Sequence, residues 1–527
     1  MDDATVTLLI LAAAVALFVW NRLPVAVVAL GAALSLHAAG VITLDESLAG
    51  FGSPTVLFIA SLFVVSEALD ATGVTAWAGQ RLVAAAAGDA NRLVALVLGL
   101  SAVLAALITP NGAVAALVPM MVVVATRIGR SPSKLLMPLA FSAHAGSLLV
   151  LTGSPVNILV SEASDGAGTG RFGFFEFAVV GLPLAIGSVG LALLLGRRML
   201  PDRRARAMAP DLSSHAQTLV VQYGITANAS GHEVPEALFT RQVGVAEVVI
   251  PPRSPLVGES VFAGMTTDSG DLVILSVQRN GEAPESERLV LAAGDVLLLE
   301  GSWRALDERL DGDEVLVVDA PAAVRRQLIA LGPGARRTLV VGVAFVAALA
   351  TGVVPAVVAG LLAAMALVLL GTLSGEQAYR AVAWPTVILI AGLIPVSEAI
   401  SSTGAADRIA SVLTDAVGGS SPYLLLAALF VVAAAFGIAV SNTATALVLI
   451  PVALSAAADL NLSPRPVLMS VAIACAASFL TPISTPGNMM VLEPGGYRFG
   501  DYWRFGLPFL GLFFVVAVFL VPQIWSF

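Results

Sequence analysis

The chain has 527 residues, of which 58% are hydrophobic and 12% charged, and its mean hydropathy is +0.92. Soluble domains are about 45–50% apolar, so most of this chain must lie in lipid. The formal net charge of −9 argues against nucleic acid as a partner. The single cysteine, Cys475, excludes an internal disulfide framework and a thiolate metal cluster.

Apolar windows of about 20 residues, the length that spans a ~30 Å hydrocarbon core, recur through 5–200 and again through 338–524. The amino terminus is acidic where a secretory signal would be basic, so we expect the first helix to be retained. A re-entrant hairpin, which enters and leaves on one side, is expected at 92–128. The crossing helices of the first region are expected at 5–20, 23–41, 53–70, 134–160 and 175–197.

Hydropathy collapses between the two apolar regions, in a segment that carries much of the charge. We therefore predict three parts, which are a first membrane repeat over 1–200, a soluble insert over 201–325 and a second membrane repeat over 326–527.

The two membrane regions repeat each other. SPTVLFIASLFVVSEALDATG from Ser53 aligns with WPTVILIAGLIPVSEAISSTG from Trp384, an offset of 384 − 53 = 331. At that same offset ALITPNGAVAALVP matches GIAVSNTATALVLIP and LTGSPVN matches PISTPGN, while GLP recurs late in each region. Four matches in one order predict an internal duplication, which is typical of secondary transporters.

The orientation of the helices follows from basic residues in short loops, which stay on the cytoplasmic side. With the amino terminus outside, most basic clusters of the first region fall inside, and the acidic loops expected at 44–47 and 161–165 fall outside. Five crossings then start the second region inside, so we predict inverted repeats and a cytoplasmic insert. Arg171, Arg408 and Arg465 fall outside against the rule.

Polar breaks interrupt the apolar runs at 109–112, 153–157, 441–443 and 484–488. Pro and Gly break a helix and free backbone amides and carbonyls, which need partners in a membrane. Half-helix amino termini favour anions, and unwound carbonyls and hydroxyls suit a hard cation such as sodium. A single kink of this kind is better explained by helix bending. Four kinks in two related pairs indicate a site for both ions.

Three ionisable residues near these breaks have more than one interpretation. Glu67 and Glu398 occupy matching positions near helix ends, where interfacial or capping roles compete with ion coupling. His144 precedes the break at 153–157, and a packed, hydrogen-bonded histidine is favoured over a proton-linked group.

These motifs resemble the divalent anion/sodium symporter family of the wider ion transporter superfamily. Ser441-Asn442-Thr443 is similar to that family's Ser-Asn-Thr hairpin tip, and 153–157 and 484–488 resemble its Gly-Thr-Pro-Pro-Asn break. The resemblance implies that hairpin tips and unwound loops together hold two sodium ions and the substrate anion. The first tip, 109–112, lacks the Ser-Asn-Thr triplet, and Pro110 competes with Asn111 as the counterpart of Asn442.

The resemblance assigns roles to individual residues of each break. It implies one half-site from Asn111, Gly112, Gly153 and Ser154, and another from Ser441, Asn442, Thr443, Ser484, Thr485 and Pro486. The predicted substrate-binding residues are Asn111, Gly112, Ser154, Pro155, Asn157, Asn442, Thr443, Thr485, Pro486 and Asn488. The predicted sodium ligands are Thr109, Asn111, Gly153, Ser441, Asn442 and Ser484.

The insert shows strand-like alternation at 244–252, 272–281 and 295–301, so we expect a small α+β domain. SPLVGESVFAG at 254–264, QRNG at 278–281 and the AGD turn at 293–295 resemble the RCK-C (TrkA-C) domain of potassium-transport regulators. The resemblance implies either a sensor for a small-molecule regulator or a pairing module without a ligand. Family members with this insert look closest to sulfate-type permeases.

The leading hypothesis is alternating-access symport of a small divalent anion, such as sulfate or a dicarboxylate, with sodium in a cell inner (plasma) membrane. The family resemblance also implies a homodimer. A sodium/proton antiporter or oxyanion efflux permease on the same fold is the alternative, but the breaks contain no titratable carboxylate. A channel gated by the insert ranks last because no TVGYG-like filter is present. We expect no enzymatic activity and no cofactor besides sodium as the coupling ion.

Overall fold

The computed structural model describes residues 2–20, 22–75, 77, 78, 81, 90–127, 131–203, 219, 243–267, 269–279, 288–310, 312, 314–318, 331, 332, 334–417, 421–438 and 440–527. Parts of the predicted basic loops, at 21, 128–130 and 204–206, and the end of the QRNG motif at 280–281 lie outside them. The chain divides into two compact units, of which the first comprises Met1–Leu69, Arg81–Met208 and Arg336–Phe527 and the second Asp70–Gln80 and Ala209–Ala335.

The first membrane region consists of helices with two interruptions where the sequence predicted them. Its elements are α1 (Asp3–Trp20), α2 (Val25–Ala38), α3 (Leu44–Leu48), η1 (Ala49–Gly52), α4 (Pro54–Ala71), α6 (Ala90–Ile108), α7 (Pro110–Arg127), η2 (Pro132–Lys134), α8 (Leu136–Gly146), η3 (Leu151–Gly153), α9 (Pro155–Gly166) and α10 (Ala178–Met199). The hairpin expected at 92–128 is the pair α6 and α7, and the helix expected at 134–160 is broken between α8 and α9. Two expectations were wrong, because 44–47 and 161–165 are helical and not loops.

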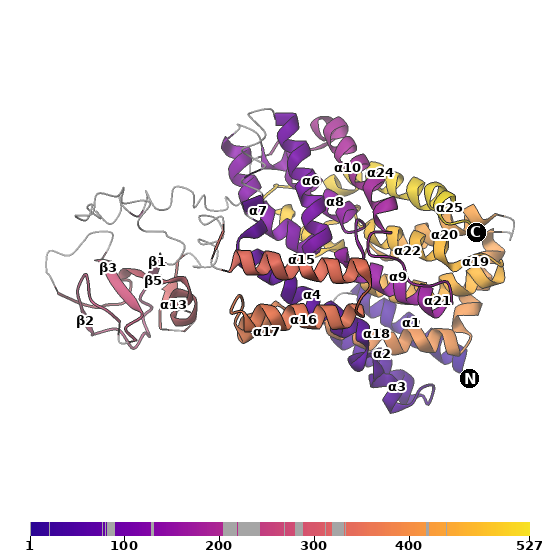
Figure 1. The fold of residues 1–527 in the computed structure, drawn as a ribbon, viewed down its shortest axis with the longest axis horizontal. Helices are drawn as coiled ribbons and strands as arrows, with labels where there is room; N and C mark the ends of the chain where they lie inside the picture. The colour runs from indigo at the N-terminus through magenta and orange to yellow at the C-terminus, as the bar shows by residue number, and fades with distance from the viewer. Residues whose placement is uncertain are drawn as a thin grey trace. The chain divides into compact units, whose positions relative to one another are not determined.

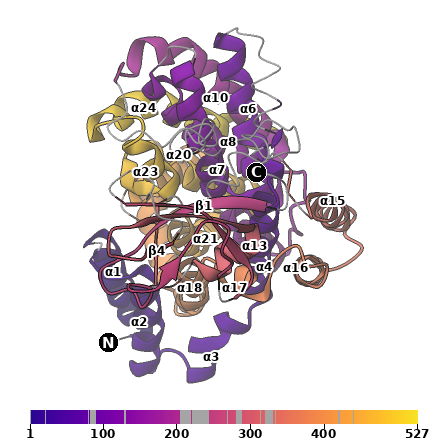
Figure 2. The ribbon, with the colours of Figure 1, turned by 90° about the vertical axis from the view of Figure 1, so that its left-hand side faces the viewer.

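The second membrane region repeats the main helices of the first in the same order. Its elements are α15 (Ala335–Thr351), α16 (Ala356–Leu369), α17 (Gly375–Ala381), α18 (Trp384–Ser402), α19 (Ala405–Val417), α20 (Pro422–Phe436), α21 (Asn442–Asp459), α22 (Pro464–Ala476), η5 (Pro482–Ser484), α23 (Pro486–Leu492), α24 (Phe499–Val515), the π-helical turn η6 (Val516–Leu520) and α25 (Val521–Ile524). In this order α15–α18 match α1–α4, and α20–α24 match α6–α10. Figures 1 and 2 show α15 and α16 lying side by side as one pair of long helices.

Local capping chemistry recurs at the offset found in the sequence. α3 begins with a capping box in which Thr43 and Glu46 exchange side-chain and backbone hydrogen bonds. α17 begins with the same box, made by Ser374 and Gln377, and 374 − 43 = 331. A capping box satisfies two of the free amides at a helix start, so the duplication preserves backbone geometry where the side chains differ.

Within the described residues, seven helices are long and apolar enough to cross a membrane. They span Asp3–Trp20, Leu44–Ala71, Asn91–Ile108, Ala178–Met199, Trp384–Ser402, Asn442–Asp459 and Phe499–Ile524. The chain is therefore a polytopic α-helical membrane protein, and the shorter apolar helices α2, α16, α20 and α22 complete the bundle.

Two glycines bring the last long helix of each region against the break of that region. A Cβ atom built on Gly181 in α10 would lie 2.0 Å from the Leu148 carbonyl oxygen. A Cβ atom built on Gly506 in α24 would lie 2.3 Å from the Phe479 carbonyl oxygen. Both carbonyls belong to the unwound segments after α8 and α22, and 479 − 148 = 331. Only glycine permits this approach of helix and loop backbone, which explains the repeated GLP motif.

The three arginines that opposed the predicted orientation all form ion pairs. Arg171 lies 2.9 Å from Asp165, and Arg408 lies 2.5 Å from Asp2. Arg465 at the start of α22 pairs with Glu176, and both side chains are less exposed than those of the other two pairs. The ion pairs give each of these arginines a structural role, but they do not change the count of basic residues on each side.

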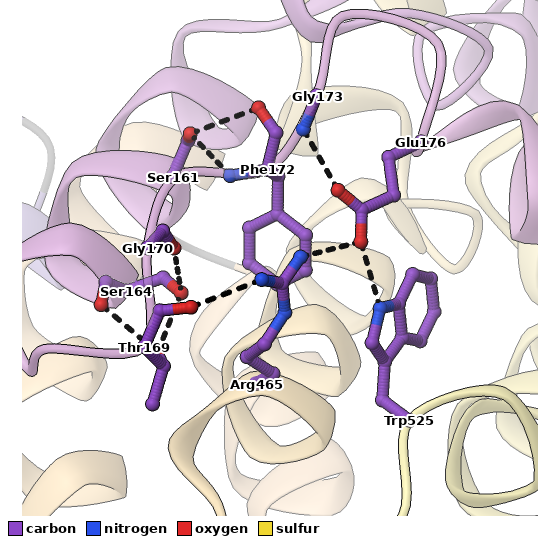
Figure 3. A network of polar contacts seen from close by, with 9 residues as sticks. All are labelled: Ser161, Ser164, Thr169, Gly170, Phe172, Gly173, Glu176, Arg465 and Trp525. Atoms are coloured by element: carbon purple, nitrogen blue, oxygen red, sulfur yellow. Dashed lines mark hydrogen bonds and ion pairs between the residues drawn. The ribbon is translucent and has the colours of Figure 1, made fainter.

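Arg465 ties the start of α22 to the α9–α10 connection and to the end of the chain (Figure 3). Its guanidinium pairs with Glu176, donates to the Thr169 carbonyl oxygen at 3.0 Å and lies 4.6 Å from the centre of the Phe172 ring. The Trp525 indole also donates to Glu176, at 2.8 Å. This clamp fixes one end of the broken helix pair α8–α9 to the other pair, α22–α23.

The second compact unit contains the predicted small sheet. Its main sheet has the order β3-β5-β1-β6, made by β1 (Val243–Val249), β3 (Leu272–Gln278), β5 (Val296–Ser302) and β6 (Leu316–Val317). β2 (Ser260–Val261) pairs with β4 (Leu289–Val290). α13 (Trp303–Arg309) follows β5 (Figure 1), and Figure 2 shows the same unit from another side. Trp303 at the start of α13 is 3% exposed in a core of valine, leucine and isoleucine side chains from these strands.

Candidate functional site

At each hairpin tip a hydroxyl side chain caps the helix that follows. Thr109 joins α6 to α7 with a positive φ of 95°, and its Oγ1 accepts a hydrogen bond from the Gly112 amide at 3.4 Å. Ser441 precedes α21 and its Oγ accepts from the Ala444 amide at 3.3 Å. Each hydroxyl satisfies one free amide at a helix start, as an N-cap residue does. These two predicted sodium ligands therefore already have a structural role.

The two broken helices are braced by a matched pair of asparagines. The Asn157 side-chain amide donates to the carbonyl oxygens of Ser147 at 2.8 Å and Val150 at 3.0 Å. The Asn488 amide donates to the carbonyl oxygens of Ser478 at 2.7 Å and Thr481 at 3.2 Å. The four carbonyls lie in the unwound loops, where helical partners are missing. Donation of both amide hydrogens to the loop leaves only the Oδ1 atoms for a ligand.

These two amide oxygens are the most direct structural indication of a cation. Asn157 and Asn488 are both 0% exposed, and neither Oδ1 atom has a well-aligned hydrogen-bond donor in the described part of the chain, although the His144 ring lies close to the Asn488 side chain. A buried acceptor without a donor costs about 1–3 kcal/mol. A hard cation takes oxygen ligands of this kind, so the residues present fit a sodium ion.

The halves differ at one position of the brace. Ser484 Oγ accepts from the Asn488 amide at 3.1 Å and donates to the Thr481 carbonyl oxygen at 2.8 Å. Gly153 stands at the matching position of the first half, since 484 − 153 = 331. A Cβ atom at Gly153 would lie 2.3 Å from the Ser147 carbonyl oxygen. The first loop therefore has no hydroxyl at this position, and the Asn157 side chain bonds its carbonyls without that support.

Contacts between the halves pair each hairpin with the opposite broken helix. The Gly487 amide at the start of α23 donates to Asn111 Oδ1 at 3.0 Å, across 376 residues of sequence. α7 packs along α23, and α21 packs along α9. The sequence grouped Asn111 with Gly153 and Ser154, but the hydrogen bond of Asn111 goes to the second half. The two breaks therefore share one polar region.

The second hairpin tip also contacts the break of its own half. Ser478 Oγ donates to Asn442 Oδ1 at 2.6 Å, and Thr481 Oγ1 donates to the Ile438 carbonyl oxygen at 3.3 Å. These contacts join the second tip to the unwound segment that precedes the predicted break at 484–488. Ser478 and Thr481 were missed from the sequence, although Ser478 repeats Ser147 at the offset of 331 and could have been found by it.

The other predicted residues line the same segments. Thr485 caps α23 with its Oγ1, which accepts from the Asn488 amide at 3.3 Å, and Ser154 caps α9 by accepting from the Val156 amide at 3.3 Å. Thr443 is buried, while Pro155 and Pro486 are the first residues of α9 and α23. Proline is favoured there because a first helical residue needs no amide hydrogen.

α4 contacts both polar segments of the first half. Ser66 donates to the Ile108 carbonyl oxygen beside the first tip at 3.2 Å, and Thr55 donates to Glu162 on α9. Glu67 and Glu398, the carboxylates considered for ion coupling, lie on α4 and α18 and not in the unwound loops.

Comparison with known proteins identifies the kind of protein to which this architecture belongs. A model of the citrate transporter family (CitMHS) matches residues 15–446 and 416–527. The chain belongs to this family. Its members and relatives are transporters, so this chain is a transporter and not an enzyme.

Relatives of this citrate transporter family member carry transporter names. The uncharacterized transporter YfbS of Escherichia coli is 30% identical, over 98% of this chain and 98% of its own length. A probable sodium/sulfate cotransporter 3 of Chlamydomonas reinhardtii is 26% identical over 53% of this chain and 33% of its own length. The crystal structure of the Alcanivorax borkumensis YdaH transporter aligns with 97% of this chain and 98% of its own, with a TM-score of 0.49 and 15% identity.

Proposed function

We propose that this family member is a sodium-coupled symporter of a small divalent anion, such as sulfate or a dicarboxylate. The observation that carries the proposal is the hydrogen bond from the Gly487 amide to Asn111 Oδ1, which joins the hairpin of one half to the broken helix of the other. Two unwound loops and two hairpin tips thereby form one uncharged polar region in a membrane bundle. Membership of the citrate transporter family and similarity to the algal sodium/sulfate cotransporter both support an anionic substrate, and the algal relative also supports sodium.

The anion and the cation are proposed to use different atoms of this region. Buried Oδ1 atoms of Asn157 and Asn488 are acceptors and suit sodium, together with the loop hydroxyls and carbonyls. Hydroxyl and amide hydrogens of the tips and caps are donors and suit an oxyanion. The sequence assigned Asn157 and Asn488 to the anion, and we now assign their oxygens to sodium.

Alternating access is the proposed mechanism, with the two halves inverted in the membrane so that each opens to one side. The hydrogen bonds of α4 to Ile108 and Glu162 would then break and re-form as the broken segments move. We further propose a plasma (inner) membrane location, a homodimer, and a cytoplasmic insert with an RCK-C-like domain that pairs or binds a small-molecule regulator.

The test is uptake of labelled sulfate, succinate and citrate into proteoliposomes, with and without an inward sodium gradient. We expect sodium-dependent uptake of one of these anions. The variant Asn442→Ala is expected to abolish uptake, because it removes the acceptor of the Ser478 hydroxyl and an amide at the second tip. Asn461→Gly is the matched control. Asn461 lies beyond the far end of α21 with φ of 53°, which glycine adopts freely, so this variant is expected to transport normally.

Three results would contradict the proposal. Anion uptake at the same rate with and without a sodium gradient would show that sodium is not the coupling ion. Proton movement driven by a sodium gradient, with no anion uptake, would favour the antiporter. Normal uptake by Asn442→Ala would show that Asn442 at the second tip is not part of the transport site.

A further inference from the structure

His144 is the one histidine that the structure describes at the junction of the two broken helix pairs. It lies in the last turn of α8 and is 2% exposed, in a helix whose residues are all buried. Its Nε2 atom lies 3.2 Å from Thr485 Oγ1, in the other half of the chain. The imidazole ring also stands edge-on to Phe479, with 6.0 Å between ring centres. Packing on Phe479 and the bond to Thr485 leave the ring little freedom.

Thr485 is one of two polar side chains of the second loop that face His144, the other being Asn488. Its Oγ1 accepts the Asn488 amide hydrogen at 3.3 Å, which occupies one of the two lone pairs of the hydroxyl. The neighbouring Gly487 amide donates to Asn111 of the first half at 3.0 Å. Thr485 therefore lies between the brace of the second loop and the contact that joins the two halves.

The hydrogen on His144 Nε2 decides what Thr485 offers to a ligand. If Nε2 carries a hydrogen, it donates to the second lone pair of Oγ1, and the hydroxyl hydrogen is free to bind an anion. If Nε2 is bare, the hydroxyl hydrogen points to the imidazole, and Thr485 offers only oxygen lone pairs to a cation. One hydroxyl thus has two opposite uses, and the histidine selects between them.

Among the described residues, the loop of the first half, at 153–157, has no histidine facing its hydroxyl. The residue matching His144 is Cys475, and the residue matching Thr485 is Ser154, since 475 − 144 and 485 − 154 both equal 331. A thiol is only a weak hydrogen-bond partner, so the first loop has no equivalent means of orienting its hydroxyl. The two loops are similar in backbone and unequal in what they can hold.

We propose that His144 is a positioning residue that determines anion specificity. It donates its Nε2 hydrogen to Thr485 Oγ1, so that the Thr485 hydroxyl becomes a hydrogen-bond donor to the transported anion. This inference rests on the proposed function. It assigns the Thr485 hydroxyl of the second loop to the anion, while Asn488 Oδ1 stays assigned to sodium. The affinity for the anion, and not for sodium, then depends on His144.

The test compares three replacements at one position. In His144→Gln the side-chain amide nitrogen reaches the place of Nε2 and can donate, whereas in His144→Asn it is one carbon too short. His144→Cys installs the residue of the matching position. A hydrogen bond to a charged group contributes about 1.5–3 kcal/mol, which corresponds to roughly 10- to 100-fold in affinity.

We expect His144→Asn and His144→Cys to raise the KM for the anion roughly 10-fold or more, with Vmax per inserted protein and the half-saturating sodium concentration close to those of the wild type. His144→Gln is expected to restore the KM to within about 3-fold. Thr485→Val, which removes the hydroxyl and keeps the shape, should raise the KM equally, and combining it with His144→Asn should add nothing.

Each other outcome overturns the inference. Equal KM values for the Gln, Asn and Cys variants would reduce His144 to a packing residue. A shift of the sodium dependence in place of the anion KM would mean that Thr485 serves the cation. Reaction of the buried Cys475 with a thiol dye on heating reports whether the Gln, Asn and Val variants are folded, because this thiol is 2% exposed. If the wild type accumulates no anion, the proposed function fails and this inference with it. If the wild type accumulates an anion and His144→Asn has a normal KM, only this inference fails.

Discussion

The asparagine braces give the sharpest prediction, because the two halves supply an internal comparison. We expect Asn157→Ala to destabilise the protein more than Asn488→Ala. Each replacement removes two hydrogen bonds to loop carbonyls inside the bundle. In the second half, Ser484 Oγ still donates to the Thr481 carbonyl oxygen at 2.8 Å and to the Ser478 carbonyl oxygen at 3.3 Å.

The magnitudes follow from what remains bonded. A buried carbonyl that loses its donor costs about 1–3 kcal/mol, and a net hydrogen bond contributes about 0.5–1.5 kcal/mol. In the first half Gly153 offers no hydroxyl, so Asn157→Ala should cost about 2–4 kcal/mol. Support from Ser484 should limit Asn488→Ala to about 1–2 kcal/mol. The order of the two variants is a firmer expectation than either value, because both share the same chemistry.

The assay uses the only cysteine of the chain. Cys475 is 2% exposed in α22, so a thiol-reactive fluorescent dye reports its exposure as the purified protein is heated in detergent. We expect the midpoint to fall in the order wild type, Asn488→Ala, Asn157→Ala, with Asn461→Gly equal to the wild type. A larger loss for Asn488→Ala, or no loss for either variant, would show that these amides do not hold the loops.

Two further predictions concern other parts of the chain. Gly506→Ala should prevent stable folding, because its Cβ would lie 2.3 Å from a carbonyl oxygen. Gly511→Ala in the same helix meets nothing within 4 Å and should be neutral or slightly stabilising. The midpoint of the thiol-dye reaction distinguishes the two variants, and equal midpoints would refute the close approach. In the sheet unit, the hydrogen bonds from Arg279 hold the pKa of Asp295 below its ordinary value of 3.8. The stability that Asp295 contributes is therefore present above pH 3.8 and lost as the pH falls below it. Asp295→Asn should reduce the increase in the rate of proteolysis of the insert that the wild type shows at acid pH. A variant whose proteolysis rate depends on pH as in the wild type would refute this.

The repeat and its breaks could be predicted from the sequence because each depends on local chemistry. Proline, glycine and asparagine interrupting an apolar run identify a broken membrane helix wherever it occurs, and the offset of 331 pairs the breaks. The helical nature of 161–165 was missed, since acidic residues at the end of an apolar run look like a loop. In the structure they continue α9 for one more turn.

The roles of individual site residues could not be predicted, because they depend on which segments meet in three dimensions. An asparagine in a break can bind a ligand or brace the loop, and Asn157 does the second with both amide hydrogens. Likewise nothing in the sequence near Asn111 shows that its partner is Gly487. The sequence favours a packed, hydrogen-bonded histidine at His144, but it does not show that the partner is Thr485 of the other half.

The pairing of Asn111 with Gly487 has a consequence for biosynthesis. The two residues are 376 positions apart, and chains grow at about 5–20 residues per second, so Asn111 enters the membrane roughly 20–75 s before its partner exists. During that interval the first hairpin must be held by the insertion machinery, by water or by a provisional partner. We expect the nascent first half to be a target for membrane quality control, and its survival to depend on how quickly the second half arrives.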